Sequence, residues 1–409
     1  MSYDLVLRRC RVADDAALTD IALADGHIAA LGPVPGAGAQ ELDVDGRVVL
    51  PGLVDAHTHL DKTLSLDRLV NTSGTLFEAI RLWRSVRGSL PRADYVDRAL
   101  AGLRLAMAAG TTAIRSHVDV GVGVELAALE ALLAVRERCR GRIDLQIVAL
   151  GLRGNDADGH GRALMAEAMR LGADAVGGAP HTEADPAAAI DFALDLAERY
   201  DRPVDLHMDE RDDPSILTLE YLAEQVIARG LQGRVTAGHC CSLAATDQAT
   251  ADRIMDKVAL AGIHVITLPS CNLYLQGRED RGLIRRGLTR VRELLERGVN
   301  VVTASDNVQD PFNPLGKGDP LLIGNLTAHA AHMGGVAEQA AVLAMLTTRA
   351  ARCLGLPDYG LAPGCRADLV VLDCRRVRDV LALMPTRLFV LKAGRVVVRS
   401  RCEQVVDLP

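Results

Sequence analysis

The chain has 409 residues, of which 49% are apolar and 24% are charged, and its formal net charge is −7. This composition is ordinary for a globular protein, and the acidic balance without basic blocks argues against a nucleic-acid polymer as partner. Nine scattered cysteines with no C-x-x-C pair predict neither a disulfide framework nor a zinc–thiolate site. Because no signal-type segment and no apolar run of about 18 residues occurs, we expect a cytoplasmic protein that makes no membrane contact.

Both ends of the chain have the pattern of short strands joined by turns. At the start these are DLVLRRCRV, DIALADGHIAAL and QELDVDGRVV, with turn signals such as ADG and GPVPGAG between them. The same pattern returns after residue 355, in LAPGCRADLVVLDC and RLFVLKAGRVVVRS. We predict that residues 1–48 and 356–409 form one small β-sandwich domain. Two separate β appendages are the alternative.

Residues 49–355 alternate apolar strands with amphipathic helices. The predicted strands are 48–57, 111–120, 142–150, 173–180, 202–209, 233–239, 263–270 and 300–306. Several of the helical stretches end in glycine, as helix C-caps do. Eight such units with nearly continuous apolar strands predict an α/β fold in which a parallel sheet closes into a (β/α)8 TIM-like barrel. A doubly wound open sheet is the alternative, but no Gly-rich phosphate fingerprint follows the first strand.

Metal-ligand side chains lie at the carboxyl ends of the predicted strands, where barrel enzymes carry their chemistry. The first strand ends in His57 and His59, whose i, i+2 spacing places both imidazoles on one face. The fifth, sixth and eighth strands end in His207, His239 and Asp306. A solvated strand end explains any one of these histidines but not the set. His57, His59, His207 and Asp306 suit one divalent ion, Zn²⁺, Fe²⁺ or Mn²⁺, with room for one water.

Several motifs carry a family resemblance. PGLVDAHTHLDK, HMDE, VTAGH and ASDN resemble the motifs of the amidohydrolase superfamily. SGTLFEAIRLW, RSHVDVG, IDLQIVAL, LQGRED, TRVRELLERGVNV and DPFNPLG resemble bacterial cytosine deaminase along nearly the whole barrel. The resemblance implies a catalytic barrel over residues 49–355, a homo-oligomer, and a single metal ion held by His57, His59 and His207 beside Asp306. It also implies Glu210 and His239 as catalytic partners.

The lysines support a single ion. Two-metal members of this superfamily commonly bridge their ions with a carboxylated lysine on the fourth strand. No lysine occurs between Lys62 and Lys257, so that bridge cannot form.

The resemblance implies hydrolytic deamination of an amino-substituted N-heterocycle, either cytosine or a close analogue. A divalent ion lowers the pKa of a bound water, so that hydroxide is available near pH 7. Asp306 is expected to take the first proton and His239 to orient the hydroxide. Glu210 is expected to protonate the ring nitrogen beside the attacked carbon and then to pass a proton to the leaving ammonia. The alternative for Glu210 is a solvated acid in the run DERDD.

The resemblance breaks at the positions that set substrate identity. Cytosine deaminases carry a glutamine after the third strand, and the matching position here is Leu152, followed by Arg153. Asn307 stands where those enzymes usually have an acid, and Phe312 stands where they have a tryptophan. Hydrogen bonds to a buried ring discriminate strongly between substrates, and these differences remove some of them. The resemblance therefore does not identify the substrate ring. Arg153 either reads a carbonyl or carboxylate of the substrate or is a solvated loop residue.

Two other functions remain as alternatives. One is an amidohydrolase that removes an alkylamine from an s-triazine, as N-isopropylammelide hydrolases do. Those enzymes resemble this barrel, but the resemblance does not extend to an acid at the position of Glu210, which favours the deaminase. The other is a non-catalytic scaffold on the same fold, which would be marked by lost metal ligands. All of the ligand-type residues are present here.

Overall fold

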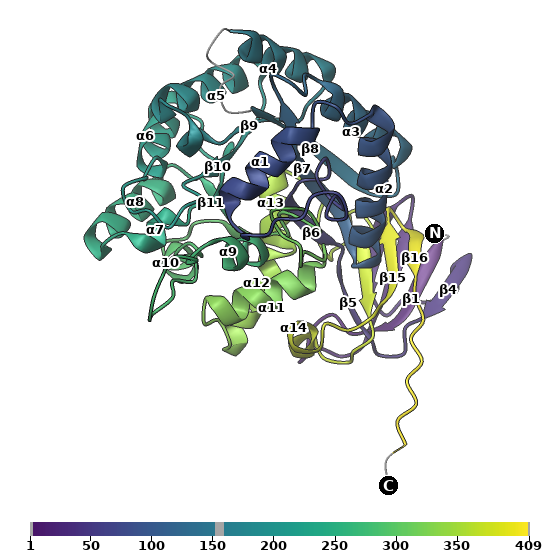
Figure 1. The fold of residues 1–409 in the computed structure, drawn as a ribbon. Helices are drawn as coiled ribbons and strands as arrows, with labels where there is room; N and C mark the ends of the chain where they lie inside the picture. The colour runs from purple at the N-terminus through teal and green to yellow at the C-terminus, as the bar shows by residue number, and fades with distance from the viewer. Residues whose placement is uncertain (1–2, 152–158, 408–409) are drawn as a thin grey trace.

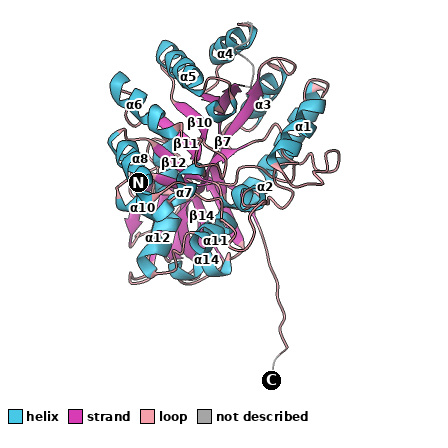
Figure 2. Cartoon of the chain, turned by 60° about the vertical axis from the view of Figure 1, so that its left-hand side comes forward, coloured by secondary structure: helices cyan, strands magenta, loops and turns pink. Residues whose placement is uncertain are grey.

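The computed structural model describes residues 3–151 and 159–407, and a parallel eight-stranded sheet forms its centre. Its strands are β6 (Leu53–Thr58), β7 (Thr111–Val120), β8 (Asp144–Gly151), β9 (Ala175–Gly178), β10 (Val204–Met208), β11 (Val235–His239), β12 (His264–Thr267) and β13 (Val301–Thr303). They follow one another in the sheet in chain order. The segment after β13 returns to β6, where the Asp306 amide donates to the His57 carbonyl at 2.9 Å. The predicted (β/α)8 barrel is therefore confirmed, with helices around its strands (Figures 1 and 2).

Helices lie between the barrel strands in the chain, and four more follow the last of them. They are α1 (Leu76–Val86), α2 (Arg92–Ala108), α3 (Ala127–Arg138), α4 (His160–Leu171), α5 (Pro186–Tyr200), α6 (Leu219–Arg229), α7 (Ser242–Ala245), α8 (Gln248–Leu260), α9 (Pro269–Leu275), α10 (Val291–Glu296), α11 (Pro320–Ala330), α12 (Val336–Met345), α13 (Thr348–Leu354) and α14 (Val380–Leu383). Two 3₁₀ turns, η1 (Pro180–Thr182) and η2 (Val377–Asp379), complete the helical elements of the described residues.

Helix α5 shows how the sequence sets these elements. Asp185 caps its start by accepting a hydrogen bond from the Ala188 amide, and Pro186 occupies the first turn, where no backbone donor is needed. Its buried residues include Ile190, Ala193, Leu194 and Ala197, which repeat at the spacing of one helix face. Burial of Ile190 and of Leu194 contributes about 1.5–3 kcal/mol each to folding.

The segment 48–57 differs from its prediction as a single strand. β5 (Val48–Pro51) pairs with β14 (Leu369–Leu372) in one of the terminal sheets, whereas β6 begins at Leu53 and belongs to the barrel. Between them, a Cβ on Gly52 would lie 2.3 Å from the side chain of Thr112, so only glycine fits. The apolar run continues through both strands because both are buried, and this continuity hides the change of sheet.

Strands from both chain ends form two further four-stranded sheets. The first has the order β3-β2-β1-β4 and the second β16-β15-β14-β5. The strands not yet described are β1 (Leu5–Cys10), β2 (Thr19–Ala24), β3 (His27–Gly32), β4 (Gln40–Asp43), β15 (Arg387–Lys392) and β16 (Arg395–Arg399). Leu7 and Ile21 from the first sheet share one buried core with Leu369, Val371 and Leu391 from the second. The predicted sandwich from both ends is present, while its boundaries at residues 48 and 356 stay a prediction.

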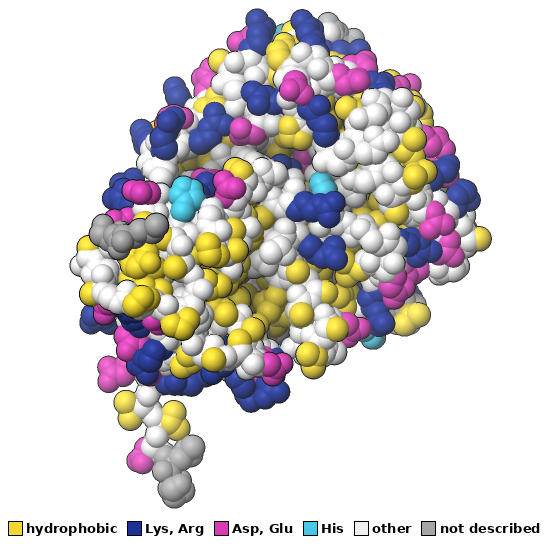
Figure 3. All heavy atoms as spheres, turned by 180° about the vertical axis from the view of Figure 1, so that it is seen from behind, with side chains coloured by type: hydrophobic (Ala, Val, Ile, Leu, Met, Phe, Trp, Pro, Cys, Tyr) yellow, Lys and Arg dark blue, Asp and Glu magenta, His cyan; other side chains and the backbone are white. Residues whose placement is uncertain are grey.

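The surface has mixed charge. Basic and acidic side chains are interspersed over the face seen in Figure 3, so that face presents no field of a single sign. Within residues 3–151 and 159–407, every helix is too short or too polar to cross a membrane. After β16 the chain runs away from the body of the molecule as an extended segment (Figure 1).

Candidate metal centre and its pocket

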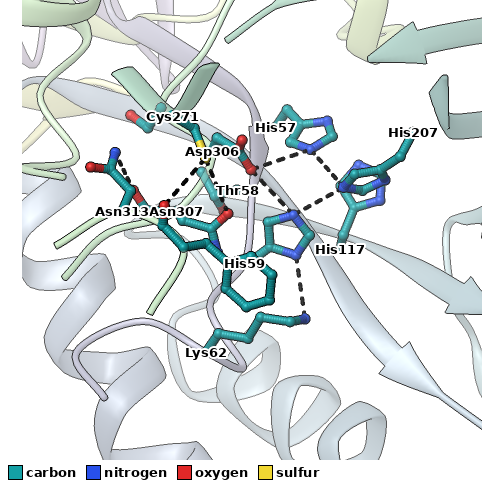
Figure 4. A network of polar contacts seen from close by, with 12 residues as sticks. His57, Thr58, His59, Lys62, His117, His207, Cys271, Asp306, Asn307 and Asn313 are labelled. Atoms are coloured by element: carbon teal, nitrogen blue, oxygen red, sulfur yellow. Dashed lines mark hydrogen bonds and ion pairs between the residues drawn. The ribbon is translucent and has the colours of Figure 1, made fainter. Parts of the chain in front are cut away.

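The candidate metal centre lies where three barrel strands end. β6 carries His57 and leads into His59, β10 carries His207, and Asp306 follows β13. The Nε2 atom of His207 is 3.2 Å from Nε2 of His57 and 3.1 Å from Nε2 of His59. Asp306 Oδ1 lies 3.3 Å from His59 Nε2 and 3.8 Å from His57 Nε2. Figure 4 shows the three rings turned toward one another with the carboxylate beside them. The structure thus brings together all four predicted metal ligands.

These residues fit a divalent cation. Ligands bound to one ion at about 2.0–2.2 Å lie about 3–3.5 Å from each other, close to the spacing found here. Both carboxylate oxygens of Asp306 are buried without a hydrogen-bond partner among the described residues. A buried carboxylate in that state is strongly unfavourable unless a cation faces it. Three nitrogens and one carboxylate suit Zn²⁺, Fe²⁺ and Mn²⁺ alike, so the ligand set does not select among them.

The ligand histidines are electrically neutral. Burial is the first cause, and it lowers the pKa of His57, His59 and His207 well below the ordinary value. For His59, the charge of Lys62 lowers the pKa further. A neutral imidazole is the form that binds a metal ion, so the cluster needs no proton release from histidine before binding at neutral pH.

The backbone at these strand ends is held in unusual conformations. Asp306 has φ 61°, His239 has φ 67° and Asp209 has φ 48°, all in the left-handed region that non-glycine residues rarely adopt. Such conformations cost about 1–3 kcal/mol each and persist where surrounding contacts fix them. The Asp209 carboxylate, for example, accepts hydrogen bonds from the Thr218 and Leu219 amides at 3.0 Å. The turns after the strands are therefore fixed rather than loose.

Gly238 packs closely against the His57 ring. A Cβ at this position would approach Cε1 of His57 to 3.1 Å and Nδ1 to 3.3 Å. That approach is tighter than ordinary packing, so a larger residue would push the His57 ring out of place. The glycine in the motif VTAGH therefore makes room for the first metal ligand, which a sequence reading cannot tell from a strand glycine.

Glu210 and His239 both border the cluster. Glu210 Oε1 lies 3.6 Å from His239 Nδ1, and both residues are buried. Burial, together with the negative charge of Asp306, raises the pKa of Glu210 well above its ordinary value, which favours the proton-donating form. Burial lowers the pKa of His239 to about 4, so its ring is neutral near pH 7. Asn272, on α9, holds this ring through its amide Nδ2, 3.1 Å from Nδ1. No sequence motif singles out Asn272.

A buried ionic network lies behind His59. Lys62 Nζ is 3.5 Å from His59 Nδ1, 2.7 Å from Asp119 Oδ1 and 3.1 Å from Asp61 Oδ2. Asp119 also accepts hydrogen bonds from the Trp83 indole at 3.0 Å and from Arg87 at 3.2 Å. Asp61, two residues after His59, contacts Lys62, and Lys62 in turn reaches the His59 ring. We name Lys62, Asp61, Asp119, Trp83 and Arg87 the Lys62 network.

Of the four residues expected to set substrate identity, two can be placed. Asn307 is buried, lines the pocket and donates from Nδ2 to Asp310 Oδ2 at 2.7 Å. Phe312 is half-buried and lines the same pocket. Leu152 and Arg153 lie outside the described residues.

One pocket of about 580 Å³ opens over the metal centre. His59, His207, His239, Glu210 and Asp306 form its floor. Helix α1 forms an outer wall, with apolar residues that include Leu76, Phe77, Ile80 and Trp83. His181 lines the pocket too, held by its Nδ1 at 3.2 Å from the His207 carbonyl. A concave, partly apolar site with convergent polar groups at its base is the usual form of a small-molecule site.

The chain is similar to known proteins over most of its length. A model of the amidohydrolase family matches residues 40–154 and 121–402. A pterin deaminase of Rhizobium rhizogenes is 37% identical over 386 residues, which cover 93% of this chain and 88% of that protein.

Two solved structures resemble the whole chain. The structure of 5-methylcytosine deaminase from Klebsiella pneumoniae liganded with 5-fluorocytosine has a TM-score of 0.94 at 38% identity, and the match covers 98% of this chain and 99% of that one. The structure of N-isopropylammelide isopropylaminohydrolase from Burkholderia multivorans has a TM-score of 0.86 at 32% identity, with coverage of 98% and 99%. Similarity over the full length means that the terminal sheets are shared as well as the barrel.

Proposed function

The chain belongs to the amidohydrolase family, and on this basis we propose that it is a metal-dependent hydrolase that releases ammonia from an amino-substituted N-heterocycle. The observation that carries the proposal is the buried cluster of His57, His59, His207 and Asp306 with Glu210 beside it at the floor of the pocket. Pterin and 5-methylcytosine, the rings named for two relatives, both bear an amino group on a carbon next to a ring nitrogen. We propose a substrate of this cyclic amidine class.

The side chains are positioned for proton transfers around such a carbon. A divalent ion held by the four ligands would lower the pKa of water and so supply the nucleophile near pH 7. Asp306, whose carboxylate has no other partner among the described residues, takes a proton from the water. Glu210 donates a proton to the ring nitrogen beside the attacked carbon. His239, held by Asn272, hydrogen-bonds the reacting oxygen through Nε2, which has no partner among the described residues.

The proposed reaction balances in atoms and protons. A carbon–oxygen bond forms to the ring carbon, and the carbon–nitrogen bond to the amino group breaks. Of the two protons of water, one ends on the ring nitrogen and the other on the departing ammonia. Glu210 and Asp306 therefore finish in the protonation states in which they began.

A second candidate function is supported by one comparison. The structure named N-isopropylammelide isopropylaminohydrolase is 32% identical to this chain over nearly its whole length. Release of an alkylamine from a triazine ring would use the same floor residues, with an alkyl group on the departing nitrogen. The pocket volume of about 580 Å³ leaves room for such a group.

The test is an amine-release screen of protein loaded separately with Zn²⁺, Fe²⁺ and Mn²⁺. The panel contains cytosine, 5-methylcytosine, isocytosine, pterin, aminotriazines and N-isopropylammelide, and both ammonia and isopropylamine are quantified. We expect ammonia from at least one amino-heterocycle, with turnover lost in Glu210→Gln and kept in Glu130→Gln, an exposed acid on α3.

The remaining outcomes separate the alternatives. Isopropylamine as the main product would establish the triazine activity instead. Protein that binds no metal and releases no amine would indicate a non-catalytic scaffold.

A further inference from the structure

Four arginines line the pocket. Arg81, Arg84 and Arg87 lie on the α1 wall, and Arg211 lies on the segment after β10, directly after Glu210. None of these residues belongs to the metal centre or to the proton transfers proposed above. Their chemistry differs from that of the floor, because guanidinium groups recognise carboxylates and phosphates.

Arg211 has the most constrained setting of the four. Its backbone amide donates to the Asp209 carbonyl at 2.9 Å, and its own carbonyl accepts from the buried Ser242 hydroxyl at 2.8 Å. Its guanidinium lies over the ring of Phe77 on α1, 5.1 Å from the ring centroid. A guanidinium stacked on an aromatic ring keeps the N–H donors along its edge available for a bidentate acceptor.

Arg211 has no ion-pair partner within residues 3–151 and 159–407. The other two arginines with characterised contacts differ in this respect. Arg87 is paired with Asp119 at 3.2 Å inside the Lys62 network, and Arg81 reaches Glu78 at 3.4 Å while its side chain is 72% exposed. Arg211 is therefore the arginine of this wall whose donors the described residues leave available.

The acids of the pocket do not cancel this charge at the outer end. Asp306 lies at the floor among the metal ligands, and Asp119 is bonded to Lys62 at 2.7 Å. Glu210 also lies at the floor, with Oε1 3.6 Å from His239 Nδ1. Glu183 remains, on the segment after β9, where it also borders a small side cavity of about 40 Å³.

We propose that the outer pocket binds a carboxylate carried on the substrate ring, with Arg211 as its principal partner. The substrate class is then an anionic amino-heterocycle, a planar ring that bears the reacting amino group at one end and a carboxylate at the other. This inference rests on the proposed function for the orientation of the ring, and it adds the charge of the substrate. The pocket volume of about 580 Å³ accommodates a substituted or fused ring, since cavities of about 300–1,000 Å³ accept drug-sized ligands.

The experiment compares matched rings with and without a carboxylate. The pairs are pterin with pterin-6-carboxylate and cytosine with 5-carboxycytosine. Affinity for the metal-loaded protein is measured by calorimetry, and kcat/KM is measured by ammonia release. We expect the carboxylated member of at least one pair to be favoured by about 10- to 100-fold, the range for hydrogen bonds to a charged group. Raising the salt concentration should reduce this preference.

Variants assign the preference to Arg211. Arg211→Gln should lower the preference for the carboxylated ring, in affinity and in kcat/KM, by about tenfold or more. Arg211→Lys keeps the positive charge but loses the bidentate geometry of the guanidinium, so it should give an intermediate preference. Arg199→Gln is the matched control, because Arg199 also stacks on an aromatic ring, Tyr200 at 5.5 Å, but lies at the end of α5 away from the pocket. Thermal unfolding of each variant shows whether it is folded.

The outcomes for binding and turnover are separable. A carboxylate preference in binding that Arg211→Gln removes, without turnover of any ring, would support this inference and refute the proposed deamination. Deamination with equal or weaker affinity for the carboxylated rings would overturn the inference and leave the function standing. A ratio that changes equally in Arg211→Gln and Arg199→Gln would also overturn it.

Discussion

Asp119→Asn tests the Lys62 network. The substitution keeps the shape of the side chain and an oxygen that can accept the Trp83 indole hydrogen bond, but it removes one negative charge. The network holds two cations, Lys62 and Arg87, against two anions, Asp61 and Asp119. After the change, two cations face Asp61 alone. Such an imbalance is costly because burial keeps water from screening it.

The magnitude follows from the exposure of these side chains. Asp119 is 3% exposed and Lys62 is 6% exposed, whereas Arg87 at 12% has some access to solvent. Removing one partner of a buried ion pair costs about 3–5 kcal/mol, and the partial exposure of Arg87 places the expected loss near the lower value, about 3 kcal/mol. Asp256→Asn is the matched control, since its ion pair with Arg297 is on the surface and is worth about 0–1 kcal/mol.

The assay is urea unfolding followed by fluorescence and by circular dichroism. Trp83 is the single tryptophan of the chain and donates to Asp119 itself, so its emission reports directly on the network. Coincident transitions in the two signals would justify a two-state free energy. The double variant Lys62→Met, Asp119→Asn should recover at least about 1 kcal/mol relative to the sum of the single changes. Loss of less than about 0.5 kcal/mol in Asp119→Asn, or no coupling between the two sites, would refute the reasoning.

Three further predictions concern the metal, the acid and the pH dependence of stability. His207→Ala should lose metal, measured by elemental analysis, and activity together; full metal content would contradict its place among the ligands. Glu210→Gln should keep the metal while turnover falls by at least about 100-fold, and an active variant would refute the proton-donor role. Hydrogen bonds from Arg253 and then Lys257 lower the pKa of Glu220 to about 2, so this carboxylate stabilises the fold above pH 4.5 and ceases to do so as the pH falls toward 2. Glu220→Gln should therefore lower the free energy of unfolding by about 1 kcal/mol at pH 7. Urea titrations should show this difference from the unsubstituted protein becoming smaller below pH 4.5. A difference that does not depend on pH would contradict the prediction.

The meeting of the candidate metal ligands could be predicted because a parallel barrel brings residues from the ends of distant strands together. All eight strands run parallel, so residues at their carboxyl ends meet on one face. His57, His207 and Asp306 are far apart in the chain, yet each follows an apolar strand and each arrives at this face. The prediction needed only the strand pattern and the residue types, both of which are local properties of the sequence.

The change of sheet at Gly52 could not be predicted, because it depends on pairing with a distant segment and not on local sequence. Hydrophobic pattern reports burial, and residues on both sides of Gly52 are buried: Val48 and Leu50 before it share one core with Leu53 after it. Nothing in VVLPGLVDAH indicates that β5 pairs with β14, more than three hundred residues later, because that pairing depends on a segment at the other end of the chain. The close approach of Thr112 explains the glycine only once both strands are placed.

Substrate recognition shows where sequence reasoning ends. Several histidines and an aspartate at the ends of barrel strands are typical of a metal site. The residues at the floor of the pocket could therefore be recognised from the sequence. The other residues of the pocket include arginine, phenylalanine and asparagine, which are common on any protein surface. Their roles depend on contacts between segments that are distant in the sequence. Arg211 becomes informative because α1 places Phe77 against its guanidinium, and Asn272 because α9 places its amide against His239. The proposed reaction class therefore rests on residues at the strand ends, whereas the proposed charge of the substrate rests on how α1 and the segment after β10 pack over them.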